Sequence, residues 1–153
     1  MRTLLDTNVL LRGSQPSSAD GDLALAAVDS LIKAGRSLFI SSQTIYEFLG
    51  VATKPVKENG LGLKQIDADH DLSRLVAGFQ ILYDSEAVAS ELRRLVVLHQ
   101  VTGKKVHDAR LVAVMNVHAI EEILTFNDAD FKRFTSVRVI TPPVAVAGLS
   151  PAP

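Results

Sequence analysis

The sequence predicts one α/β domain in which a mostly parallel sheet of about five strands carries helices on both faces. Short apolar runs of strand length alternate along the chain with longer segments whose apolar residues recur at helical spacing. Such alternation is typical of strand–helix–strand units, which build parallel sheets. The composition agrees, because 47% of the 153 residues are hydrophobic and 22% are charged, as expected when strands are buried on both faces.

Five short apolar runs are predicted to be the strands. The predicted strands cover residues 3–5, 37–40, 80–83, 123–125 and 137–140.

The intervening segments carry apolar residues at intervals of three and four, which predicts helices. One of these helices follows the capping residues Ser41 and Ser42, and another, over residues 108–118, is nearly all apolar and should be buried. The tail, residues 142–153, contains four prolines and is expected to be extended beyond a domain of residues 1–141. The remaining predicted helices cover residues 22–33, 68–78 and 88–99.

The composition excludes several classes of protein. The chain has no cysteine, so it has no disulfide framework, thiolate nucleophile or cysteine zinc site, in agreement with a reducing cytosol. The net charge of −1 gives no overall sign of nucleic-acid binding. No apolar run reaches the roughly 18 residues of a membrane span, and no signal peptide is evident, so we expect a cytoplasmic protein without a membrane partner.

The first candidate for a functional group is a carboxylate at the end of a strand. Asp6 directly follows the first predicted strand, and Thr7 and Asn8 come next. Ligands and catalytic groups collect beyond the carboxyl ends of parallel strands, so Asp6 is placed to bind a metal ion or to transfer a proton. Aspartate is also a favoured helix N-cap, and Asp6 alone does not decide between the two roles.

Three further acidic residues are predicted to reach the same edge of the sheet. Glu47 lies in the helix after the second strand, Asp108 begins the apolar helix, and Asp130 follows the fourth strand. Each has an ordinary alternative as a solvated or capping residue. Converging carboxylates repel one another, and a divalent cation relieves this repulsion. Oxygen ligands suit Mg²⁺ or Mn²⁺, whereas zinc is not expected without cysteine or paired histidines.

Four segments together resemble the PIN-domain family and, within it, the VapC-type toxin ribonucleases. The resemblance extends from residue 3 to about residue 140 and rests on residues 5–10, 41–47, 107–113 and 125–131. It implies a three-layer α/β/α PIN-like fold and a metal-dependent endoribonuclease, a hydrolase that cuts phosphodiester bonds with Mg²⁺ or Mn²⁺.

The resemblance also implies roles for individual residues. Asp6 and Asp108 match the principal metal ligands of the family, and Glu47 matches its second acidic position. At the fourth position the chain has Asn127 where aspartate is frequent, and the acid comes later as Asp130. The expected catalytic set is therefore Asp6, Glu47, Asp108 and Asp130, with Asn127 as the alternative to Asp130.

The resemblance implies an RNA substrate, a cognate antitoxin that blocks the site, and a homodimer. Lys104 and Lys105, which lead into Asp108, are the best candidates for phosphate contacts. Two alternatives stay open: a non-catalytic PIN-like module that binds RNA or protein, and a housekeeping PIN nuclease. A haloacid-dehalogenase phosphatase is disfavoured, since it needs a second aspartate where this chain has Asn8.

Overall fold

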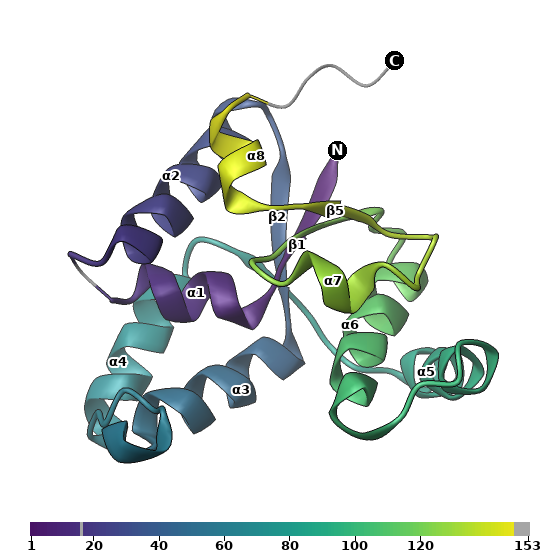
Figure 1. The fold of residues 1–153 in the computed structure, drawn as a ribbon, viewed down its shortest axis with the longest axis horizontal. Coiled ribbons are helices and arrows are strands. Elements are labelled where there is room, and N and C mark those ends of the chain that lie inside the picture. The colour runs from purple at the N-terminus through teal and green to yellow at the C-terminus, as the bar shows by residue number, and fades with distance from the viewer. Residues whose placement is uncertain (16, 149–153) are drawn as a thin grey trace.

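A five-stranded sheet forms the centre of the structure, a computed structural model that describes residues 1–15 and 17–148 (Figure 1). The strand order is β3-β2-β1-β4-β5, and every neighbouring pair is parallel. The predicted sheet is therefore confirmed. The strands are β1 (Arg2–Leu5), β2 (Ser37–Ser41), β3 (Gln80–Leu82), β4 (Glu122–Leu124) and β5 (Arg138–Ile140).

Helices cover both faces of the sheet and complete three layers. Serine side chains begin two of the longest helices: the hydroxyl of Ser18 accepts from the N–H of Gly21 and that of Ser85 from the N–H of Val88. The helices are α1 (Thr7–Gly13), α2 (Ala19–Lys33), α3 (Ser42–Thr53), η1 (Val56–Glu58), α4 (Gln65–Val76), α5 (Glu86–Leu98), η2 (Gly103–Lys105), α6 (Val106–Val117), α7 (Asp128–Phe131) and α8 (Pro142–Val146).

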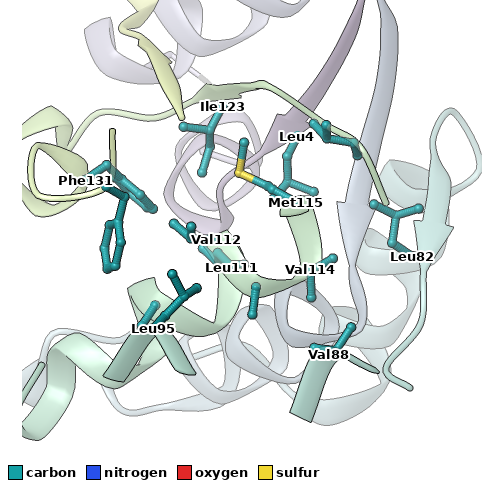
Figure 2. Packing of buried hydrophobic residues seen from close by; sticks show 14 of the residues in the cluster. Leu4, Leu82, Val88, Leu95, Leu111, Val112, Val114, Met115, Ile123 and Phe131 are labelled. Carbon is teal, nitrogen blue, oxygen red and sulfur yellow. The ribbon is translucent and has the colours of Figure 1, made fainter. Parts of the chain in front are cut away.

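Successive strand residues point to opposite faces, and each face has its own core. Leu4 and Ile123 pack with α5, α6 and α7 on one face (Figure 2). Leu5 and Leu124 pack with α1 to α4 and α8 on the other. In helix α6, the residues from Leu111 to Met115 are all buried, as its sequence predicts.

The proline-rich segment departs from the prediction. Residues 142–146 form helix α8, which packs against α2 and buries Pro142 and Ala145, so an extended conformation is wrong for them. Proline is compatible with the first turn of a helix, where its missing N–H has no intrahelical partner. Residues 149–153 of the predicted tail lie outside the described residues.

The strand order defines the position at which open parallel sheets usually form a ligand crevice. From β1 the chain builds β2 and β3 to one side, and then returns to place β4 and β5 on the other side. Open parallel sheets bind ligands where the order reverses, beyond the carboxyl ends of the strands. Here that point lies between β1 and β4, directly before Asp6 and Thr125.

None of the helices described is long and apolar enough to cross a membrane.

Candidate active site

Asp6 lies at the point where the strand order reverses. Its N–H donates to the carbonyl of Leu124 at 3.0 Å, which extends the pairing of β1 with β4. Thr125 Oγ1 donates to Asp6 Oδ2 at 2.6 Å, and Asn8 Nδ2 donates to the same oxygen at 2.8 Å. Although Asp6 occupies the N-cap position of α1, its side chain makes no capping hydrogen bond. The side chain is thus held by neutral donors at the crevice.

The surroundings of Asp6 oppose its ionisation. The pKa of its carboxyl group is raised to about 6, mainly by burial and in addition by the negative charge of Glu47. The hydrogen bond from Thr125 and the nearby N–H groups of Thr7 and Asn8 act in the opposite direction. Hydrogen bonds from neutral groups therefore do not offset the cost of a buried charge at this position.

Glu47 is fixed through both of its carboxylate oxygens. Thr7 Oγ1, on α1, donates to Oε2 at 2.6 Å, and Gln43 Nε2, one turn earlier on α3, donates to Oε1 at 2.7 Å. His107 Nδ1 lies 3.8 Å from Oε1. Helix α3 begins directly after β2, where the Ser41 hydroxyl accepts from the N–H of Thr44. Because α1 begins in the same way after the parallel strand β1, both helices start at the same edge of the sheet (Figure 1).

Asp108, in the first turn of α6, lies among the other acids. Its pKa is raised to about 6, mainly by burial and in addition by the negative charges of Asp130, Asp6 and Glu47. The charge of His107 acts in the opposite direction. The charges of the other three acidic residues that the sequence analysis selected therefore all act on the carboxyl group of Asp108.

The two candidates for the fourth position have different surroundings. Asp130 lies in α7, which is anchored by the buried Phe131, and its charge is the strongest of those that raise the pKa of Asp108. Asn127 is exposed and occupies the N-cap position of α7, but its side chain makes no capping hydrogen bond. Its N–H donates to Thr125 Oγ1 at 3.0 Å. Of the acidic side chains, that of Asp130 therefore has the strongest electrostatic effect on the pKa of Asp108.

Basic residues contribute less to the site than the sequence suggests. Lys104 and Lys105 are exposed in η2, directly before α6. Arg138 is paired with Glu122 at the opposite edge of the sheet. In the part of the chain that the structure describes, no lysine or arginine forms an ion pair with Asp6, Asp108 or Asp130.

Three residues that the sequence analysis left without a role support this site. Gln43, Arg110 and Asp84 form a chain of polar contacts that ends at Glu47. The spacing of Gln43 and Glu47, four residues apart on one helix face, was a usable signal for the first of them. The contact of Arg110 with Gln43 spans 67 residues, so local pattern gives no sign of it.

The donor set fits a hard divalent cation. The converging groups are carboxylates, with hydroxyl and amide oxygens beside them, and such oxygen donors suit Mg²⁺ or Mn²⁺. A cation would oppose both causes that raise the pKa values of Asp6 and Asp108, which are burial and the repulsion between acids. Among residues 1–15 and 17–148, no three histidine or acidic side chains form a ready-made cage for an ion.

Comparison with known proteins shows the family. A model of the PIN domain matches residues 3–136, so the chain belongs to the PIN domain family. This match covers β1 to α7 and all four acidic residues. No match is found among curated protein sequences.

Solved structures share the fold along nearly their whole length. The structure of VapBC2 from Rickettsia felis bound to a DNA fragment from the VapBC2 promoter has a TM-score of 0.71 at 17% identity. The match covers 92% of this chain and 98% of that one. A toxin–antitoxin complex from Klebsiella pneumoniae has a TM-score of 0.63 at 22% identity, over 92% and 97%. VapC20 from Mycobacterium tuberculosis, a sarcin–ricin loop cleaving toxin, has a TM-score of 0.60 at 15% identity, over 89% and 98%.

Proposed function

We propose that this PIN domain protein is a metal-dependent endoribonuclease, the toxin of a VapBC-type toxin–antitoxin pair. The observation that carries the proposal is the group of four acidic side chains, in which burial and the charges of neighbouring acids raise the pKa values of Asp6 and Asp108. Among the described residues, no lysine or arginine pairs with Asp6, Asp108 or Asp130. A folded protein keeps such repulsion at a cost in stability, and a site that binds a cation gives a reason for it. The VapC20 structure, named as a toxin that cleaves the sarcin–ricin loop, supports RNA as the substrate.

Each side chain has a distinct proposed role. Asp6 and Asp108 would hold Mg²⁺ or Mn²⁺, with Asp130 next to Asp108. When bound, such an ion acidifies water and stabilises charge on phosphoryl oxygens. Glu47, held by Thr7 and Gln43, orients the attacking water or accepts its proton. Thr125 and Asn8 keep Asp6 in place.

Charge outside the acidic group guides the substrate. The carboxylates repel RNA phosphates unless a cation is bound, so substrate and cation are expected to bind together. Lys104 and Lys105 precede Asp108 on η2 and are exposed, and lysines at such a position attract a phosphate backbone without reading its sequence. Cleavage should therefore weaken as salt concentration rises.

The direct test is cleavage of labelled RNA by purified protein with Mg²⁺ or Mn²⁺. Chelation should abolish cleavage, and Asp6→Asn should lower its rate by about 100-fold or more, since metal catalysis contributes several kcal/mol. Asp67→Asn, at an exposed position of α4, is the matched control and should cut like the wild type. Unchanged RNA binding without metal-dependent cleavage would support the non-catalytic module instead.

A second experiment separates a toxin from a housekeeping nuclease. Expression of the wild type alone should arrest growth of the host, whereas Asp6→Asn at equal protein level should not. Equal growth would remove the toxin proposal and leave the nuclease proposal intact. The related toxin–antitoxin complex from Klebsiella pneumoniae supports a protein partner, and an antitoxin that presents arginine would complement the acidic site. We also propose a homodimer, which light scattering of the purified protein would test.

A further inference from the structure

We propose that Gln43 is a positioning residue that fixes the carboxylate of Glu47, and that Arg110 holds the Gln43 amide in the orientation this requires. The inference rests on the proposed function, because Glu47 is the group on which Gln43 acts. It concerns residues for which neither the family match nor the motif assigns a role.

The Gln43 amide lies between the two helices that carry Glu47 and Asp108. Its side chain is 1% exposed although it is polar. Gln43 Nε2 donates to Glu47 Oε1 at 2.7 Å and to the backbone carbonyl of His107 at 3.1 Å. His107 directly precedes Asp108 on α6, so one amide group sets the position of Glu47 relative to the start of that helix. A buried amide with these partners has no water to replace them.

Arg110 determines which way the Gln43 amide faces. Arg110 Nη1 donates to Gln43 Oε1 at 2.8 Å, so the amide oxygen faces a cation. A reversed amide would direct Nε2 at the guanidinium and Oε1 at the Glu47 carboxylate, and both contacts are repulsive. With Arg110 in place, only the orientation that donates to Glu47 satisfies every group.

Arg110 is itself held by groups outside the acidic site. It forms an ion pair with Asp84, which follows β3, and Ser42 Oγ donates to Asp84 Oδ2 at 2.9 Å. Its guanidinium also lies 5.5 Å from the ring centre of Tyr46, whose hydroxyl accepts from Nη1 at 3.1 Å. With 19% of its side chain exposed, Arg110 is restrained on several sides and forms a stable support for Gln43.

These contacts hold the Glu47 carboxylate from two sides. Thr7 binds Oε2 from α1, and Gln43 binds Oε1 from within α3. A carboxylate with one donor on each oxygen cannot rotate about its last bond without losing a hydrogen bond. Its direction is therefore fixed before substrate binds, which lowers the cost of reaching a reactive geometry.

The test compares Gln43→Met, which keeps the length of the side chain and removes its polar atoms, with Arg110→Met and the control Arg94→Met. Arg94 is an exposed arginine of α5 paired with Glu91, away from this group. We expect Gln43→Met and Arg110→Met to lower kcat for RNA by about 10-fold or more with little change in KM. Arg94→Met should leave both values unchanged, and Arg110→Lys, which retains a cation, should restore part of kcat.

A second readout shows whether Gln43 acts through Glu47. Calorimetric titration with Mn²⁺ should show weaker binding in Gln43→Met than in the wild type, because the Glu47 charge is no longer held at the site. In a Glu47→Ala background the same substitution should have no further effect. An equal loss in both backgrounds, or wild-type kcat in folded Gln43→Met, overturns the proposal.

A third readout is independent of metal and RNA. The side-chain amide signals of Gln43 in an NMR spectrum should shift in Glu47→Ala and in Arg110→Met, but not in Arg94→Met. Unshifted signals would show that these contacts do not exist in solution. If the wild type neither cuts RNA nor binds Mn²⁺, the proposed nuclease function is wrong, and the NMR comparison still decides the orientation of Gln43.

Discussion

Two buried carboxylates at opposite edges of the same sheet, Asp6 and Glu122, have opposite surroundings. Glu122 begins β4 and is fully buried, and its charge is matched by Arg36 at 3.2 Å and by Arg138. Thr3 Oγ1 adds a hydrogen bond at 2.6 Å. Asp6 follows β1 and has hydrogen-bond donors that are neutral, with other acids as its charged neighbours.

This difference separates a structural edge from the edge that we propose to be functional. At the amino ends of the strands, arginines offset a buried charge and link β4 to β5 and to the start of β2. Removing one partner of such a buried ion pair strongly lowers the stability of the protein. At the carboxyl ends, the charge is left without an ionic partner and the pKa of Asp6 rises to about 6. A buried charge without an ionic partner is a departure from the usual pattern, and such departures are expected mainly at functional sites.

The largest expected effect is at the structural edge. Glu122→Ala should lower the free energy of unfolding by about 3 to 5 kcal/mol, because it leaves a largely buried arginine without its partner. Urea denaturation measures this loss. Cleavage of RNA per folded molecule should remain at the wild-type level, and a loss of activity in the folded fraction would contradict the separation of the two edges.

At the functional edge, removing a charge should increase stability in a pH-dependent way. The pKa of Asp6 rises from 3.8 to about 6 on folding, so the folded state loses stability as the pH increases through this interval. Asp6→Asn has no proton to release there. Its free energy of unfolding, relative to the wild type, should therefore increase by up to about 3 kcal/mol between pH 4 and pH 7.

Chemical denaturation of both proteins across this pH interval provides the measurement. Asp67→Asn, on the exposed surface of α4, controls for loss of an aspartate as such. A constant difference between Asp6→Asn and the wild type at all pH values would show that the folded protein does not oppose ionisation of Asp6.

A divalent cation should produce the same stabilisation by a different route. Mn²⁺ at 100 times its Kd should stabilise the wild type by about 2.7 kcal/mol, because binding favours the folded state. Asp108→Asn should lose most of this increase, whereas Glu122→Ala should keep it despite a lower starting stability. Thermal melting with and without Mn²⁺ gives the comparison, and equal increases in all three proteins would place the ion elsewhere.

The smallest expected effects distinguish Asn127 from Asp130. Asn127→Ala should change the free energy of unfolding by less than the ~1 kcal/mol of a typical N-cap loss, since its side chain makes no capping hydrogen bond. Asp130→Asn should weaken Mn²⁺ binding measured by calorimetry. If Asn127→Asp instead tightens binding and Asp130→Asn has no effect, Asn127 fills the fourth position.

The sequence by itself determined the features that depend on local pattern. The spacing of apolar residues predicts the five strands and the buried helix α6, because backbone geometry repeats over a few residues. The position of Asp6 after the first strand also predicts its edge of the sheet, since parallel strands end on the same side. With these two facts and the order of the elements, the sequence selected the acids that the fold brings together.

Only the tertiary structure decided which distant side chains meet. Arg138 and Lys105 are both cations near a predicted element boundary, yet the register that pairs Glu122 with Arg138 places Arg138 at the structural edge. In the same way, the packing of α3 against the start of α6 decides that Gln43 contacts Arg110. Proline content likewise gave no sign that residues 142–146 fold as α8, because apolar contact with α2 supplies the stabilisation. Such contacts depend on segments far apart in the chain, and local periodicity carries no information about them.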